Sequence, residues 1–198
     1  MIYNVNIYGL DESIKASGYP KNIKLMKNSN INNNDINRAE SLGHADHGSG
    51  HDCFLKGIIV QHDIFATQAF WQQWQRYHFH DIISSQSKMH NILKLSKNKE
   101  NFHYLVEPSI INTINEMVNL YNSLDNSIEW MNIVYNKKEF FQKIIYNVPM
   151  GFKLGARVNT NYLQLKTIYE QRKHHRLEEW LQYCGWIETL KSFKTLIL

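Results

Sequence analysis

Polar and apolar residues alternate over residues 1–9, and this period of two predicts a first strand. We expect a short helix over residues 11–17, which the Gly and Pro at positions 18 and 20 would end. Residues 21–37 are rich in Asn and Lys and hold few large apolar side chains, so we expect a surface loop there. The N-terminal part of the chain is therefore predicted to contain a strand, a short helix and a loop.

The next apolar segment, residues 54–65, is dense in β-branched and aromatic side chains, which predicts a second strand. A helix is expected to begin at residue 66 or 67 and to carry the segment 73–88. This segment combines aromatic rings, cationic side chains and small hydroxyls within a few turns of that helix. A segment that only fills a core would not have this composition.

Residues 94–101 form a second polar stretch that predicts a loop, and Pro108 opens another helix. The expected apolar stripe of that helix consists of Ile110, Ile114, Met117, Tyr121 and Leu124. A strand is predicted over residues 152–158, and residues 159–161 would cap a long helix that contains Arg172. The expected buried face in the second half of this helix consists of Leu177, Trp180, Leu181 and Cys184.

These elements predict an α+β fold, in which a small mixed or antiparallel sheet packs with long helices. No internal repeat is visible in the sequence. With 198 residues, of which 43% are hydrophobic and 13% aromatic, the chain suits one domain spanning residues 1–198. It is long enough to bury a core without disulfides or metal ions.

The charge is mildly positive, +4 with ten His uncounted, and no run of Lys or Arg is present. This balance suits a small anionic ligand, and we expect no nucleic-acid polymer as a partner. Cys53 and Cys184 have apolar neighbours, no CxxC spacing and no secretory leader before them, which predicts reduced core thiols in a cytoplasmic protein. No apolar run reaches the roughly 18 to 20 residues that cross a bilayer, so we expect no membrane association.

At helical spacing, Gln73, Arg76, Tyr77 and His80 share one side of the predicted motif helix. Arg offers charge-assisted hydrogen bonds to phosphate, Ser and Gln can bond to the edges of a planar ring, and Tyr and His can stack against one. An exposed amphipathic face is the simpler interpretation. The hydroxyl-rich residues 84–87 directly downstream favour a site for a phosphorylated, planar ligand.

Two further clusters could carry chemistry. On the later long helix, residues at steps of three or four form a cationic stripe: Tyr162, Lys166, Tyr169, Arg172 and Arg176. Such a stripe often meets an anion, and the alternative is a solvated basic surface paired with nearby Glu residues. The second cluster consists of His44, Asp46, His47, His51 and Asp52, in a Gly-spaced loop. It could hold a metal, form a turn or contact a cofactor, but it lacks a regular metal-binding spacing, so we assign no metal ligand.

The motif resembles the signature of flavin-dependent thymidylate synthases (ThyX), which is Arg-His-Arg, seven residues and then Ser, preceded by Gln-Trp. The matching positions here are Gln73 and Trp74, Arg76 to His78, and Ser85 to Lys88. The order of the flanking segments also agrees with the family. A Gly-His loop, Gly43-His44 or Gly50-His51, precedes the strand and the motif, and Val148-Pro149, Asn161 and Arg172 come after them. The chain looks even more like a compact, phage-associated set of uncharacterised relatives. The matches cover roughly residues 43–92 and 148–187.

The chain departs from that signature at three positions. Tyr77 stands where the family has His, His78 stands where it has its second Arg, and Gln86 occupies the position of its Ser. His78 lacks the permanently charged fork of an Arg, which predicts a weaker or reshaped contact to flavin or its phosphates. Nucleotide binding is therefore better supported than flavin dependence.

The resemblance implies that FAD, with NADPH and methylenetetrahydrofolate as co-substrates, serves the transfer of a one-carbon unit to dUMP. Arg172 would be the catalytic residue that stabilises charge on the pyrimidine. The implied substrate-binding residues are Gln73, Arg76, Ser85, Gln86, Ser87, Lys88, Arg157 and Arg172. The implied cofactor-binding residues are His51, Arg76, Tyr77, His78 and Asn161. The family builds its sites from several subunits, which implies a homotetramer here.

Two other functions stay open at this point. One is a catalytically silent relative that binds a pyrimidine nucleotide, as a sensor or a sequestering protein, which the altered signature favours. The other is a metal-dependent phosphohydrolase or nuclease built on the His-Asp loop. The enzyme itself could make dTMP or add another one-carbon group to a pyrimidine for modified phage DNA.

Overall fold

The computed structural model describes residues 1–22, 30–46, 48–123 and 126–198. They form helices and antiparallel strands, which confirms the predicted α+β class. The chain divides into two compact units. The first unit contains residues 1–64, 74–84 and 157–198, and the second unit contains residues 65–73 and 85–156. One domain spanning residues 1–198 stays a prediction.

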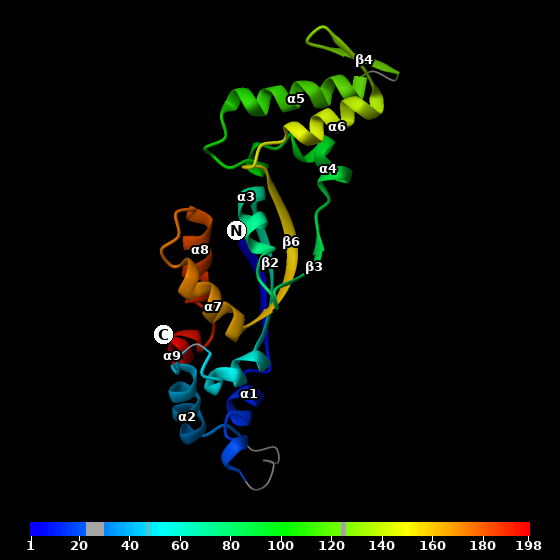
Figure 1. Ribbon diagram of the computed structural model, residues 1–198. Helices are drawn as coiled ribbons and strands as arrows, with labels where there is room; N and C mark the ends of the chain where they lie inside the picture. The colour runs from blue at the N-terminus through cyan, green and yellow to red at the C-terminus, as the bar shows by residue number, and fades with distance from the viewer. Residues whose placement is uncertain (23–29, 47, 124–125) are drawn as a thin grey trace. The chain divides into compact units, whose positions relative to one another are not determined.

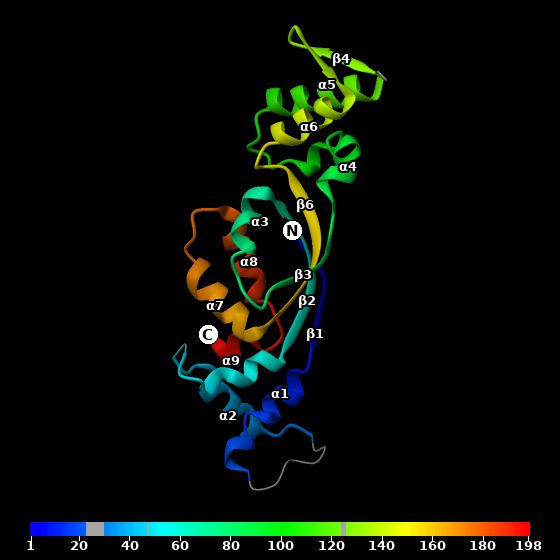
Figure 2. The same cartoon turned by 45° about the vertical axis from the view of Figure 1, so that its right-hand side comes forward.

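The strands are β1 (Ile2–Tyr8), β2 (Ile59–Thr67), β3 (Asp81–Ser85), β4 (Ser127–Trp130), β5 (Ile133–Asn136) and β6 (Lys153–Asn161). The α-helices are α1 (Leu10–Ala16), α2 (Asn33–Gly43), α3 (Gln68–Trp74), α4 (Lys88–Leu95), α5 (Pro108–Ser123), α6 (Lys137–Asn147), α7 (Tyr162–Arg172), α8 (Glu178–Ile187) and α9 (Phe193–Ile197). Three short 3-10 helices are η1 (Tyr19–Lys21), η2 (His51–Gly57) and η3 (Lys99–Asn101). Figure 1 and Figure 2 show their course along the chain.

The main sheet has four strands in the order β1-β2-β6-β3. β1 and β2 pair antiparallel, from Ile2 opposite Ile64 to Tyr8 opposite Ile59. Side chains of β2 alternate between buried and half-buried positions, as expected for a strand with one face in a core. On its buried face this strand carries His62 between apolar neighbours, and it thereby places a polar ring inside the first unit.

The core of the first unit contains a cluster of aromatic rings. Trp74 and Trp180 stack with their ring centroids 6.1 Å apart, and the His80 ring lies 3.5 Å from that of Trp74. The His62 Nε2 atom lies 3.1 Å from the Tyr183 hydroxyl. Burial lowers the pKa of His62 to about 3 and lowers the pKa of His80 well below its usual value. Both imidazoles are therefore neutral parts of the core.

A buried ion pair connects η2 and α7 in the same unit. The Lys166 ammonium donates to the Asp52 carboxylate at 2.9 Å, and it also donates to the backbone oxygens of Gly43 and Ala45 at 2.9 and 2.8 Å. The two side chains are only 7% and 4% exposed. Lys166 is therefore not part of an exposed cationic stripe, and the prediction of such a stripe is wrong at this position.

In the second unit, α5 and α6 pack together, and the antiparallel hairpin of β4 and β5 contacts α6 (Figure 1). Ile114 and Met117 of the predicted stripe are buried, whereas Ile110 is 41% exposed. Leu124 lies outside the described residues. Asn136 forms a capping box at α6 of this unit, and Asn161 caps α7 of the first unit as predicted.

The predicted motif helix over residues 66–88 is too long. α3 ends at Trp74, and β3 follows from Asp81 to Ser85. Phe79 has a φ of +56°, which a right-handed helix cannot continue. The four residues Gln73, Arg76, Tyr77 and His80 are thus not presented by one helix face, and His80 is buried instead.

The predicted long helix after Asn161 is also interrupted. α7 ends at Arg172 and α8 begins at Glu178. In the segment between them, the Leu177 amide donates to His175 Nδ1 at 3.0 Å. Trp180 and Cys184 are buried as expected, while Leu181 is 42% exposed.

Smaller elements also differ from the prediction. Within the polar stretch 21–37, residues 23–29 lie outside the described residues, and α2 begins at Asn33 with a capping box from Asn32. The first part of the predicted strand 54–65 belongs to η2. Cys53 is exposed, so it is not a core thiol. Within the described ranges, no helix is long and apolar enough to cross a bilayer.

Candidate functional site

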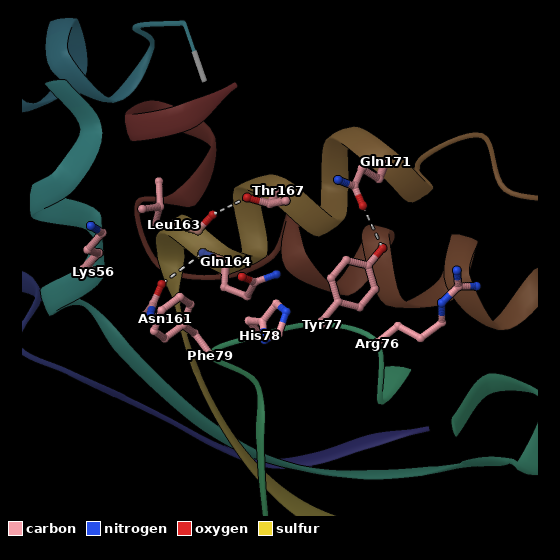
Figure 3. Close-up of a pocket in the computed structure, with 10 residues that line it drawn as sticks. All are labelled: Lys56, Arg76, Tyr77, His78, Phe79, Asn161, Leu163, Gln164, Thr167 and Gln171. Atoms are coloured by element: carbon pink, nitrogen blue, oxygen red, sulfur yellow. Dashed lines mark hydrogen bonds between the residues drawn. The ribbon is translucent and has the colours of Figure 1, made fainter. Parts of the chain in front are cut away.

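The first unit contains a cavity of about 560 Å³, which lies within the roughly 300–1,000 Å³ range of small-ligand pockets. Its lining residues, drawn in Figure 3, are Lys56, Arg76, Tyr77, His78, Phe79, Asn161, Leu163, Gln164, Thr167 and Gln171. They come from η2, the segment after α3, and α7. Four of the five predicted cofactor-binding residues, Arg76, Tyr77, His78 and Asn161, therefore meet at one cavity.

One wall of the cavity is one side of α7. The Asn161 side chain accepts a hydrogen bond from the Gln164 amide at 2.9 Å, and this cap fixes where the helix begins. Leu163, Thr167 and Gln171 then follow at steps of four and lie along one side of the helix (Figure 3). The helix N-terminus carries the positive end of the helix dipole, so the end of this wall at Asn161 favours anionic groups.

The opposite wall is the irregular segment from Arg76 to Phe79. Phe79 combines a φ of +56° with a side chain that is 74% exposed. The buried Thr160 hydroxyl donates to the Phe79 carbonyl at 3.2 Å and helps hold this backbone in place. A non-glycine residue in this region of φ costs free energy, and such residues concentrate at ligand sites.

The charged groups that line the cavity are the cations Lys56 and Arg76. Lys56 and Arg76 are exposed, and within the described part of the chain neither has a hydrogen bond or an ion pair. No carboxylate belongs to the described residues that line the cavity. Uncompensated positive charge beside apolar walls attracts anionic planar ligands.

Arg172 lies next to the cavity and is held by aromatic rings. Its Nε donates to the Tyr77 hydroxyl at 2.7 Å, and that hydroxyl donates to the Gln171 side-chain oxygen at 3.1 Å. The Arg172 guanidinium lies 4.8 Å from the Trp180 ring centroid and 5.5 Å from that of Tyr77. Tyr77 and Gln171 line the cavity, whereas Arg172 is half-buried behind them.

The predicted substrate residues after β3 make local bonds in the second unit. The Gln86 side-chain oxygen accepts the Gly155 amide at 2.8 Å, Ser87 caps α4, and Lys88 Nζ donates to Gln68 Oε1 at 3.0 Å. Burial lowers the pKa of Lys88. Ser85 ends β3 and is exposed, and Gln73 is half-buried in α3.

Two other predicted residues lie away from the cavity lining in the first unit. Arg157 pairs with Asp63 at 3.1 Å and donates to the Asn4 carbonyl at 2.7 Å. His51 begins η2 and is exposed, while Lys56 of the same element lines the cavity. These positions leave the assignments of Arg157 and His51 as predictions.

The His-Asp loop has a structural role at one of its members, because Asp52 binds the buried Lys166. Across residues 1–22, 30–46, 48–123 and 126–198, no group of three or more His, Cys, Asp or Glu side chains is placed to hold a metal ion. His47 lies outside the described residues.

Sequence reasoning missed six lining residues, namely Lys56, Phe79, Leu163, Gln164, Thr167 and Gln171. Gln164, Thr167 and Gln171 could have been found, because steps of three and four from the predicted Asn161 cap reach them, whereas Leu163 lies only two positions after the cap. Lys56 and Phe79 carry no such periodic signal, since they lie in a 3-10 helix and an irregular segment.

Comparison with solved structures identifies the architecture. The thymidylate synthase X (ThyX) from Helicobacter pylori with FAD and dUMP superposes with a TM-score of 0.69 at 12% identity, over 98% of this chain and 97% of that chain. A second structure of the flavin-dependent thymidylate synthase ThyX from the same organism, complexed with FAD and dUMP, gives 0.71 at 13% identity, over 99% and 97%. The fold is ThyX-like. No protein-family model matches the sequence, and no curated protein matches it.

Proposed function

We propose that this protein is a flavin-dependent thymidylate-synthase-like enzyme that transfers a one-carbon unit to a pyrimidine nucleotide, dUMP. The observation that carries the proposal is the cavity itself. Arg76, Tyr77, His78 and Asn161, which the resemblance to ThyX nominated for flavin, line it together. The ThyX-like fold over nearly the whole chain supports the same conclusion, because the two similar structures contain FAD and dUMP.

The side chains that line the cavity suit the chemistry of a flavin. Tyr77, Phe79 and Leu163 offer apolar surface to a planar ring system, and Arg76 and Lys56 offer donors to phosphate oxygens. Arg76, Tyr77, His78 and Asn161 would hold FAD, and His51 remains a further candidate. Bound flavin would supply the redox chemistry of the methylation, with NADPH and methylenetetrahydrofolate as co-substrates.

The protein's own part in the reaction is to orient the pyrimidine and to stabilise charge that develops on it. Arg172 is the candidate catalytic residue, and its permanently charged guanidinium suits an electrostatic role worth roughly 2–4 kcal/mol. Its contacts with Tyr77 and Trp180 limit the orientations of the guanidinium. Gln73, Arg76 and Arg157, with Ser85 to Lys88, are the proposed substrate-binding set. A homotetramer with shared sites, as the resemblance implies, could complete the nucleotide site.

The test is a flavin and nucleotide titration of the purified protein. We expect a visible flavin spectrum, thermal stabilisation by FAD and a further stabilisation by dUMP, each of about 2.7 kcal/mol at a hundredfold excess of ligand over its Kd. Arg76→Gln should lose most of the FAD effect, whereas Arg176→Gln, the same charge change on an exposed side chain outside the cavity lining, should keep it. Full FAD stabilisation in Arg76→Gln would contradict the proposed site.

A second function, a silent nucleotide-binding relative, is favoured by one contact. The Tyr77 hydroxyl that accepts from Arg172 also donates to Gln171, so the Arg172 side chain is engaged inside the protein on at least one side. In that case dUMP or dTMP would stabilise the protein, while FAD would neither bind nor support turnover. Tritium release from labelled dUMP in the presence of FAD, NADPH and methylenetetrahydrofolate separates the two functions.

A further inference from the structure

Lys56 places a positive charge at one end of the cavity. It lies outside the motif segment 73–88. In the view of Figure 3, Lys56 lies on the side of the cavity where Leu163 and Asn161 are drawn, while Arg76 lies on the other side, beyond Tyr77. The two cations come from separate elements, η2 and the segment after α3. A ligand that fills the cavity from end to end therefore meets a cation at both ends.

The backbone around Lys56 is fixed, although its side chain is exposed. The neighbouring Leu55 and Ile58 are fully buried, and η2 packs against both α1 and α7. An anchored backbone with an exposed ammonium needs little ordering on binding beyond that of the side chain itself, which limits the entropic cost of capturing a ligand.

No nearby carboxylate of the same element neutralises Lys56. The one acidic residue of η2 is Asp52, and the ammonium of the buried Lys166 already compensates its charge at 2.9 Å. Among the described residues Lys56 has no hydrogen bond or ion pair of its own, in contrast to Lys166 with its three acceptors. The charge of Lys56 is therefore available to a ligand.

We propose that Lys56 forms an anion subsite that binds a phosphoryl group of the ligand, so that the cavity selects phosphorylated flavins over the unphosphorylated ring system. The apolar residues between Lys56 and Arg76 would take the planar rings, and the Lys56 ammonium would donate charge-assisted hydrogen bonds to phosphate oxygens. This inference rests on the proposed flavin function and adds to it the residue that distinguishes phosphorylated flavins from riboflavin.

The experiment compares FAD, FMN and riboflavin binding to the full-length wild type, Lys56→Gln and Lys191→Gln by fluorescence titration. Lys191 is exposed and outside the cavity lining, so it is the matched control. The wild type and Lys191→Gln should prefer FAD or FMN to riboflavin by about tenfold or more. Lys56→Gln should lose most of this preference with riboflavin binding and thermal midpoint unchanged, and Lys56→Arg should restore it.

A preference that survives in Lys56→Gln, or a wild type that binds riboflavin as tightly as FAD and FMN, overturns the subsite. If the wild type binds no flavin, the proposed function fails and pyrophosphate tests the subsite separately. Pyrophosphate should then shift backbone amide NMR signals of η2 and the first turn of α7 in the wild type and not in Lys56→Gln. Equal shifts in both proteins, or none in either, would overturn it.

Discussion

The two halves of the predicted ligand motif have different fates in the structure. In the first unit, Arg76 to Phe79 line a cavity, and the cation of Arg76 has no partner among the described residues. In the second unit, Gln86, Ser87 and Lys88 make hydrogen bonds to their own fold. Both halves contain residue types that suit a phosphorylated ligand. Residue type therefore predicts the chemistry a side chain can perform, while its internal partners decide whether it is available for that chemistry.

The lysines of the first unit show the same difference more sharply. Lys166 is 7% exposed and bound by Asp52 and two backbone oxygens, whereas Lys56 is exposed at the cavity. Side chains bound within the protein should affect stability when they are replaced, whereas side chains exposed at the cavity should affect ligand binding. The variants below test which of these two groups each residue belongs to.

The largest loss of stability is expected from Lys166→Met. The change leaves the Asp52 carboxylate buried without its cation, which should cost about 3–5 kcal/mol in the free energy of unfolding. Urea denaturation measures it. The double variant Asp52→Asn with Lys166→Met should lose less, because no unpaired charge then remains. A loss below about 1 kcal/mol in the single variant would show that Lys166 is not a structural cation.

Acid should separate the two histidines of the motif. Burial holds the pKa of His80 well below its usual value and that of the adjacent His62 at about 3, so the unfolded state binds protons first. The contribution of His62 to stability is complete above pH about 6.5 and decreases as the pH falls toward 3, by about 1.4 kcal/mol per pH unit. The contribution of His80 decreases in the same direction, because its pKa is also lowered by burial.

Urea denaturation between neutral and acidic pH measures this loss. His80→Phe should reduce the slope against pH, while His78→Gln, at the exposed cavity residue, should leave it unchanged. An equal slope in the wild type and in His80→Phe would place the acid sensitivity elsewhere.

A smaller effect is expected in the second half of the motif. Gln86→Ala removes the acceptor of the Gly155 amide, a bond of 2.8 Å, and should cost about 1 kcal/mol of stability. Ser85→Ala, at the neighbouring exposed position, should stay within about 0.5 kcal/mol of the wild type. Thermal unfolding of both variants tests the assignment. If Gln86→Ala instead weakens dUMP binding with no loss of stability, Gln86 belongs to the ligand site.

The smallest change in stability should come from Arg76→Gln. This side chain is exposed and makes no hydrogen bond within the described residues, so the free energy of unfolding should change by less than about 0.5 kcal/mol. Its affinity for FAD should nevertheless fall about tenfold or more. Denaturation and titration of the same preparation measure both quantities. A large loss of stability with unchanged affinity for FAD would show that Arg76 is a structural residue and not a ligand-binding one.

Much of the fold follows from local sequence. The strand at residues 2–8, the helix opened by Pro108 and the Asn161 cap were predicted because alternation, helix-start residues and capping act over a few positions. The break after Trp74 was not predictable in this way. It depends on the φ of Phe79 and on the contact between His80 and Trp74, which tertiary packing creates.

The candidate site was predicted in part for the same reason. Its motif residues were recognised from their order, while Lys56 enters the cavity from a distant segment and Arg172 is engaged by Tyr77 across 95 positions of sequence. Contacts between such separated positions have no periodic signature. The buried role of Lys166 was missed because its helical spacing with Arg172 resembles that of an exposed cationic face.

The number of FAD molecules bound per chain shows whether the cavity beside α7 is a flavin site. Equilibrium titration of the wild type with FAD, followed by flavin fluorescence, should show saturable binding of one FAD per chain, which Arg76→Gln weakens and Arg176→Gln does not. Absence of saturable binding in the wild type, or equal binding in all three proteins, would contradict the claim that the cavity beside α7 is a flavin site.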